Sequence, residues 1–165
     1  MQIAAADCPA ACGQSTPVSV RACGAIGDGV ADDTNAINCA ITAATTHHAH
    51  VAVHGQRTEA SVADVLFPAG AYLVSQTISL GAQPPRLHGE GNAIIHMADP
   101  SADVFVGTAV TNWRCSDIAI VGGRDQLRVS NDNSDRSAML IERVTFHNAS
   151  GAAIRTAGPS SPTAR

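Results

Sequence analysis

The residues best suited to chemistry gather in one polar stretch of sequence SNDNSDRS, which spans residues 130–137. Asp132 and Asp135 lie three positions apart in it, and two neighbouring carboxylates can act as a general acid and base. Arg124 and Arg128 precede them, and guanidinium groups bind anionic ligands. The plainer interpretation, which we favour, is a polar turn between strands. Asp132 and Asp135 are therefore the candidate catalytic residues, and Arg124 and Arg128 are candidate ligand-binding residues.

Metal chemistry finds little support in the pattern. Asn131, Asn133 and Asp135 alternate as in the first half of a Ca²⁺ loop, but Arg136 stands where such a loop uses glycine. A separate histidine cluster has no carboxylate or cysteine at a ligand spacing, and we interpret it as a solvated loop. We therefore expect no cofactor and no metal site, with Ca²⁺ as the alternative. The clustered histidines are His47, His48, His50 and His54.

A further candidate is His147, which directly follows Phe146 in a predicted strand. An imidazole at that place can face outward and contact a ligand in a groove. The alternative is an ordinary surface histidine. His147 thus joins the two arginines as a candidate binding residue.

A second motif, Gly27-Asp28-Gly29, stands shortly before the pair Asp32-Asp33. It lacks the lysine of a phosphate-binding loop, the third glycine of a dinucleotide fingerprint and the closing glutamate of a Ca²⁺ loop. Flanking glycines favour a tight turn, and Asp32 or Asp33 is suited to cap a following helix. Apolar residues recur at helical spacing after them, so we predict a short amphipathic helix over residues 34–44.

Composition narrows the class of protein. With 165 residues the chain is long enough for one domain with a packed core. Its formal charge of -4 argues against nucleic-acid binding, and no apolar run approaches the roughly 20 residues that cross a bilayer. No secretory signal peptide is visible. The odd number of cysteines leaves at least one thiol unpaired, whichever disulfides form among Cys8, Cys12, Cys23, Cys39 and Cys115.

Strand patterns dominate the second half of the chain. The run VLFPAGAYLVSQTISL, residues 65–80, alternates apolar and polar positions on either side of a turn at Pro68 and Gly70. Apolar residues then recur with an offset of 26, which aligns strand with strand. Short strands that repeat every two dozen or so residues are typical of a β-solenoid, whereas a sandwich or small barrel usually carries regular hairpin turns. The aligned sets include Leu87, Trp113 and Met139; Ile94, Ile120 and Phe146; Cys115 and Ile141; Ile78 and Val104.

Three stretches together resemble a known family. They are VSVRACGAIGDGVADDTNAINCAI, VLFPAGAYLVSQTISL and RLHGEGNAIIHM. They are similar to the N-terminal portion of the pectate-lyase-like parallel β-helix superfamily, in the branch of rhamnogalacturonases, polygalacturonases, epimerase-like domains and phage tailspikes. In that branch Asp-Asp-Thr opens a helix that caps the solenoid, and a Phe-Pro-x-Gly-x-Tyr strand pair follows, here Phe67 to Tyr72. The resemblance is specific over residues 18–97 and weaker over 104–154.

The resemblance implies an all-β fold: a right-handed parallel β-helix with a short N-terminal capping helix and about three coils, truncated at its C-terminal end. It divides the chain into an N-terminal tail at residues 1–17, the cap and first coils at 18–154, and a flexible tail at 155–165. Two features depart from the family pattern. Cys23 replaces the usual aromatic residue, and the connection over residues 45–63 is longer than usual.

The resemblance also implies a polysaccharide partner and an extracellular or cell-surface location. We expect the N-terminal part of a glycoside hydrolase or polysaccharide lyase that acts on pectin-like acidic glycans, with this segment mainly structural. The alternative is a non-catalytic β-helix adhesion or fibre module, such as a tailspike-like carbohydrate-binding protein. The family's catalytic carboxylates are not visible in this chain, so its own enzymatic activity stays open. We expect no nucleic-acid or membrane partner, and the exposed solenoid edge allows a homo-oligomer.

Overall fold

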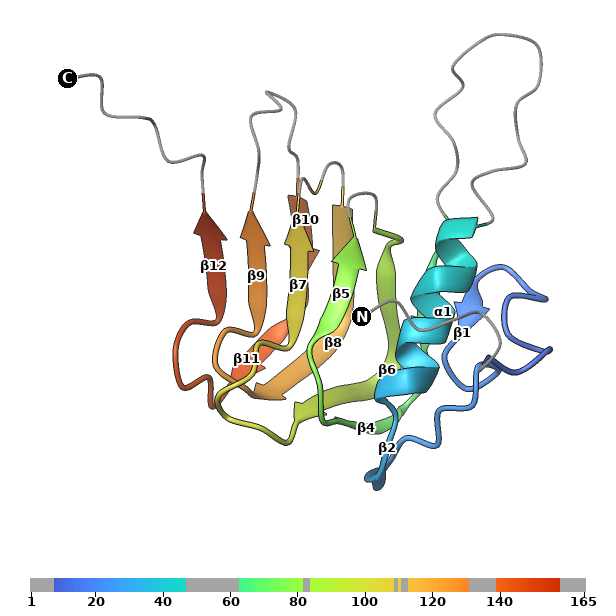
Figure 1. The fold of residues 1–165 in the computed structure, drawn as a ribbon, viewed down its shortest axis with the longest axis horizontal. Helices are drawn as coiled ribbons and strands as arrows, with labels where there is room; N and C mark the ends of the chain where they lie inside the picture. Colours follow the sequence, from blue (N-terminus) through green and yellow to red (C-terminus); the bar gives the residue numbers. More distant parts are fainter. Residues whose placement is uncertain are drawn as a thin grey trace, which may run out of the picture.

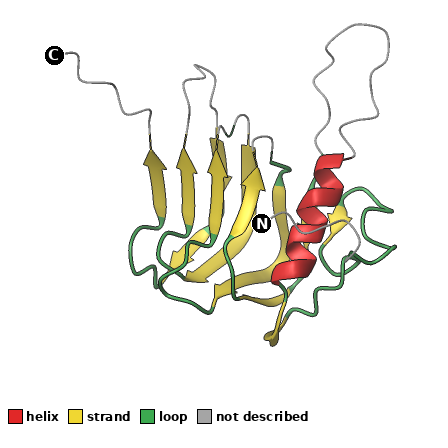
Figure 2. Cartoon of the chain, viewed as in Figure 1, coloured by secondary structure: helices red, strands yellow, loops and turns green. Residues whose placement is uncertain are grey.

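The structure is a computed structural model that describes residues 8–46, 63–81, 84–108, 110, 113–130 and 139–157. In these ranges the strands wind into a parallel β-solenoid of about three turns, with one helix at one end of the stack (Figures 1 and 2). Every strand pair is parallel, as a solenoid requires. The predicted fold class is therefore confirmed.

Two sheets form the walls of the solenoid. The eight-stranded sheet contains β1 (Val18–Ser19), β2 (Asp28–Asp32), β3 (Val65–Phe67), β4 (Gly70–Val74), β6 (Leu87–Met97), β8 (Trp113–Gly122), β10 (Met139–Glu142) and β11 (Thr145–His147). The four-stranded sheet contains β5 (Ile78–Gly81), β7 (Phe105–Thr108), β9 (Leu127–Ser130) and β12 (Ile154–Ala157), in the order β12-β9-β7-β5. We call each successive turn a rung: β3–β5, β6–β7 and β8–β9 are three rungs, with β10–β12 stacked on the last.

The rung spacing agrees with the 26-residue repeat only in the later rungs. Trp113 pairs with Met139, and Ile120 pairs with Phe146, both as predicted. Leu87 pairs instead with Cys115, because the register of β6 against β8 shifts between His88 and Ala93. The turns also differ in length, so Ile78 pairs with Phe105 and not with Val104. A single fixed offset cannot describe rungs of unequal length.

The core lies between the two sheets and is built from alternate strand residues. In β5, for example, Ile78 and Leu80 are buried while their neighbours are exposed. Trp113 is only 2% exposed, and its indole nitrogen donates a hydrogen bond to the Pro85 carbonyl, at 2.9 Å. A buried indole is stabilised by such a partner. The largest fully buried side chains are Trp113, Tyr72, Phe67, Phe105, Ile37, Ile78, Leu87, Ile95, Met97, Ile118, Ile120 and Leu127.

Helix α1 (Thr34–Thr46) closes one end of the four-stranded sheet, two residues longer than predicted. It stands next to β5 at the end of the row of strands, where a further strand of that sheet would lie (Figure 1). Its buried face is made of small and branched side chains, which lets the helix approach the sheet closely. The predicted role as a cap is confirmed by this position. The buried residues of α1 are Thr34, Ala36, Ile37, Cys39, Ala40, Ile41 and Ala44.

The adjacent carboxylates before α1 have separate structural tasks. Asp32 accepts a hydrogen bond from the Thr34 amide at 3.0 Å, which caps the helix start. Asp33 is 1% exposed and reaches backward, accepting from the amides of Ile26 and Gly27 at 2.7 and 3.0 Å. The motif therefore joins the turn before β2 to the helix, as the sequence predicted, and carries no ligand-binding geometry of its own.

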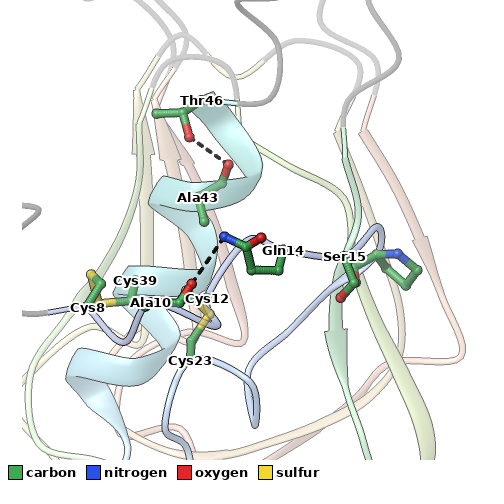
Figure 3. Close-up of a disulfide and its surroundings, with 10 residues drawn as sticks. Cys8, Ala10, Cys12, Gln14, Ser15, Cys23, Cys39, Ala43 and Thr46 are labelled. Atoms are coloured by element: carbon green, nitrogen blue, oxygen red, sulfur yellow. Dashed lines mark hydrogen bonds between the residues drawn. A yellow bond between two sulfur atoms is a disulfide. The ribbon is translucent and has the colours of Figure 1, made fainter.

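Two disulfides fasten the described part of the N-terminal segment to the cap (Figure 3). Cys8 is bonded to Cys39 on α1, and Cys12 is bonded to Cys23. The predicted tail at residues 1–17 is therefore held covalently from Cys8 onward. Cys23, for which the resemblance implies an aromatic residue, is 2% exposed and disulfide-bonded. Cys115 is the free cysteine, and its burial raises the pKa of the thiol to about 12.

Candidate functional site

The candidate catalytic carboxylates Asp132 and Asp135 lie outside the described residues, as do the Ca²⁺-like positions Asn131 and Asn133. The histidine cluster at residues 47–54 also lies outside them. These candidates remain predictions.

Arg124 and Arg128, the two candidate binding arginines, converge on one carboxylate of the protein itself. Arg124 donates two hydrogen bonds to Asp103, both at 2.9 Å, and Arg128 donates a third at 3.3 Å. Asp103 is only 5% exposed, and the hydrogen bond from Arg124 is the main cause that lowers its pKa. The structure thus brings both arginines together, but it directs their guanidinium groups at Asp103.

The same arrangement recurs one rung further along. Arg155 on β12 donates two hydrogen bonds to Asp125, which is 2% exposed, and the Ala152 amide donates a third at 3.0 Å. The bond from Arg155 is the main cause that lowers the pKa of Asp125. In each case a buried aspartate accepts from an arginine of the next rung. These ion pairs connect rungs, and their carboxylates stay ionised at neutral pH.

His147, the remaining candidate, lies at the end of β11 with an exposed side chain. Its backbone carbonyl accepts a hydrogen bond from the Gln126 side-chain amide, at 2.5 Å. Within the described residues no partner holds its imidazole. His147 therefore faces outward, and its role as a binding residue stays a prediction.

A groove that the sequence did not single out lies on the eight-stranded sheet. Its cavity volume is about 200 Å³. Leu87 pairs with Cys115, so the preceding residues Arg86 and Arg114 occupy the same position on neighbouring rungs. Two positions further along the strands, a second column of stacked residues runs across three rungs, because His88 pairs with Ser116 and Ser116 pairs with Glu142. We call this the arginine groove; it is lined by Asp64, Arg86, Leu87, His88, Arg114, Ser116, Glu142 and Arg143.

Several polar groups in the arginine groove are only weakly paired. Arg114 and Glu142 lie 3.8 Å apart with both side chains at least 40% exposed, a geometry worth little in water. Arg86 is exposed, and its guanidinium group has no ion-pair or hydrogen-bond partner among the described residues, whereas its backbone carbonyl accepts from the Val65 amide. The Oδ1 atom of Asp64 is buried, yet it lacks a hydrogen-bond partner within the described part of the chain. The groove therefore presents guanidinium donors to a ligand, and the Asp64 carboxylate lies in its lining.

A polar cluster beside the groove invites comparison with a hydrolytic triad. His88 Nδ1 lies 3.0 Å from Ser116 Oγ and 3.5 Å from Asp117 Oδ2. A triad needs the base to contact its nucleophile and its carboxylate through different ring nitrogens, but here both partners meet the same nitrogen. Arg143 also donates two hydrogen bonds to Asp117, and this contact is the main cause that lowers the pKa of Asp117. The cluster is therefore suited to binding, not to nucleophilic catalysis.

Part of the groove was within reach of sequence reasoning. Ser116 and Glu142 differ by 26 positions, as do Asp117 and Arg143, so the 26-residue repeat aligns these polar residues as it aligns the apolar ones. Arg86 and Arg114 differ by 28, because the register shifts in this strand pair. Only the structure reveals that they share a column.

Two further properties concern the described residues. No three metal-binding side chains come close enough there to hold an ion together. The one helix among the described residues is also too short to pass through a bilayer.

Comparison with known proteins agrees with the architecture. The family model described as rhamnogalacturonase A/epimerase, pectate lyase-like, matches residues 17–110, more than half of the chain. The crystal structure of PfbA, a surface adhesin of Streptococcus pneumoniae, superimposes with a TM-score of 0.51 at 22% identity. The match covers 91% of this chain and 41% of that one, so the chain spans less than half of the neighbour's length. At this identity the likeness concerns the fold alone. No curated protein matches the chain.

Proposed function

The chain belongs to the rhamnogalacturonase A/epimerase, pectate lyase-like family, and we propose that it is the capped N-terminal part of an extracellular polysaccharide-active protein. Its role in that protein is mainly structural. It closes the first rung of the solenoid and provides the stacked rungs on which a glycan can lie. Pectin-like acidic glycans are the expected substrate class, and a hydrolase or lyase is the expected enzyme.

The observation that carries this proposal is the covalently fastened cap. Helix α1 covers the end of the four-stranded sheet, and the Cys8–Cys39 disulfide ties it to the N-terminal segment. A solenoid needs such a cover, because an open end exposes core side chains and unpaired strand edges. Disulfides persist mainly in oxidising compartments, which supports an extracellular or cell-surface location.

The described carboxylates favour a structural role over catalysis for this segment. Asp103, Asp117 and Asp125 each accept hydrogen bonds from an arginine, and their pKa values are lowered. A general acid in glycoside cleavage needs a raised pKa instead. Asp132 and Asp135 stay the candidate acid–base pair that the sequence predicts.

A second candidate function is a non-catalytic adhesion module. The same engagement of Asp103, Asp117 and Asp125 by arginines favours it, since a binding protein needs no free acid. The similar PfbA structure is described as a surface adhesin. The two candidates differ in whether bound glycan is cleaved.

A cleavage and binding assay separates them. The 165-residue protein is incubated with polygalacturonate and rhamnogalacturonan, and new reducing ends and 4,5-unsaturated products are measured beside glycan binding by affinity electrophoresis. We expect retarded migration without products. Turnover that disappears in Asp132→Asn/Asp135→Asn would overturn the structural role, and unretarded migration with every glycan would overturn the polysaccharide assignment.

A further inference from the structure

The arginine groove has the position of a binding surface formed by consecutive rungs. Arg86 and Arg114 directly precede the paired residues Leu87 and Cys115, so they extend from neighbouring rungs whose backbones lie about 4.8 Å apart. Guanidinium groups that extend from neighbouring rungs can bind the two oxygens of one anionic group. Glu142 is the nearest carboxylate to Arg114 at 3.8 Å, so the pair does not neutralise itself tightly.

The groove also contains a carboxylate, because Asp64 is one of its lining residues. Its Oδ1 atom is buried and unpartnered within the described residues, and a carboxylate can accept hydrogen bonds from ligand hydroxyls through either oxygen that faces the groove. Ser116 and His88 add further polar atoms on the neighbouring rungs. A ligand that fits this lining carries both hydroxyl groups and a negative charge.

The remaining properties of the groove select among anionic ligands. Its one apolar lining residue, Leu87, is fully buried, and no Phe, Tyr or Trp side chain lines it. Apolar peptides therefore find no surface for burial, and the His88 ring is the one side-chain ring in the lining on which a base could stack. A sugar residue with a single anionic group satisfies these limits.

We propose that the arginine groove is a binding site for an acidic sugar residue, with its anionic group held between Arg86 and Arg114 and one of its hydroxyls donating to Asp64. This inference rests on the proposed function, which supplies the polysaccharide. It assigns binding to rungs that the sequence predicts to be mainly structural. The anionic group is a carboxylate or a sulfate ester, since both present paired oxygens to guanidinium.

The test is a titration of the full chain with three trisaccharides by isothermal calorimetry: trigalacturonate, a sulfated galactotriose and neutral galactotriose. We expect binding of one or both charged sugars and at least tenfold weaker binding of the neutral one. The stronger of the two charged ligands identifies the anionic group. Equal affinity for neutral and charged sugars would overturn the acidic class.

Variants locate the site. Arg86→Gln/Arg114→Gln should weaken binding of the charged sugar at least tenfold, whereas Glu142→Gln should strengthen it, because it removes the competing carboxylate. Arg155→Gln removes one positive charge from the four-stranded sheet and is the matched control; circular dichroism checks that each variant is folded. If the double variant binds the charged sugar with the same affinity as the wild type, the assignment of the binding site to the arginine groove is wrong, but the proposed function still stands. Wild-type protein that binds no glycan at all would overturn both.

Discussion

Asp117 and Arg143 lie at the same position on adjacent rungs, and both have a positive φ, of 60° and 51°. Their neighbours are in register, since Ser116 pairs with Glu142 and Ala119 with Thr145. The Arg143 guanidinium donates two hydrogen bonds to the Asp117 carboxylate, one of them at 2.8 Å. A left-handed backbone is unfavourable for residues other than glycine, yet the same left-handed turn occurs at Asp117 and at Arg143 on adjacent rungs. The ion pair stabilises two strained turns at once.

The left-handed turn at Asp117 leaves no room for a side chain at Gly89 on the neighbouring strand. A Cβ atom added to Gly89 would lie 2.1 Å from the Asp117 carbonyl oxygen. Gly89→Ala should therefore destabilise the protein by roughly 1–3 kcal/mol or more through overpacking, measured as a lower urea midpoint. Gly81→Ala is the control, because nothing lies within 4 Å of its added Cβ and only its φ of 70° opposes the change. Equal losses in both variants would contradict the steric explanation.

The cap disulfides should contribute separately to stability. The Cys8–Cys39 bond spans 31 residues and the Cys12–Cys23 bond spans 11. Loop entropy predicts that Cys8→Ser/Cys39→Ser lowers the free energy of unfolding by roughly 3–4 kcal/mol, and Cys12→Ser/Cys23→Ser by about 1 kcal/mol less. Guanidinium unfolding of both variants, with the wild type oxidised and reduced, checks the order. A reduced wild type as stable as the oxidised protein would refute it.

Trp113 should be the most sensitive core position of its rung. Trp113→Ala removes a buried indole and should lower the free energy of unfolding by roughly 3–5 kcal/mol. Trp113→Phe keeps most of the packing but deprives the Pro85 carbonyl of its donor, so its loss should be about 1–3 kcal/mol. Chemical unfolding followed by circular dichroism measures both. Leu140→Ala is the control, since Leu140 is 42% exposed and its loss should stay within about 0.5 kcal/mol.

Stability should fall in acid because of the inter-rung aspartates. Arg124 lowers the pKa of Asp103 below its unfolded value, so the folded state favours the ionised carboxylate. This contribution is fully present above the unfolded pKa of about 3.9 and is lost as the pH falls through the lower folded pKa. The contribution of Asp103 to the thermal unfolding midpoint should therefore stay constant from about pH 5 to about pH 8, and the midpoint should drop below about pH 4. Asp103→Asn should flatten the acid limb, and an unchanged limb would contradict the assignment.

The fold was largely accessible from sequence because its signals are local. The spacing from Thr34 to Ala44 and the carboxylates before it specify the cap, and the Trp113–Met139 pairing follows from a 26-residue repeat. The site was less accessible because it depends on contacts between rungs. Arg124 and Arg128 look available in the sequence, but their partner Asp103 lies a whole rung away. Only folding brings that carboxylate to them.

The arginine groove illustrates the same limit. Arg86 and Arg114 share a column because the register of β6 on β8 shifts between His88 and Ala93. Hydrophobic periodicity does not record a bulge of this kind, since both registers bury apolar residues. The orphaned oxygen of Asp64 is likewise a property of three-dimensional packing.

Helix α1 has one more consequence, for how molecules can join. It lies against β5, so a strand from another molecule could extend the four-stranded sheet there only by displacing the helix. The helix therefore closes this end of the sheet to strand addition, so that molecules cannot stack end to end through β5 while the cap stays in place.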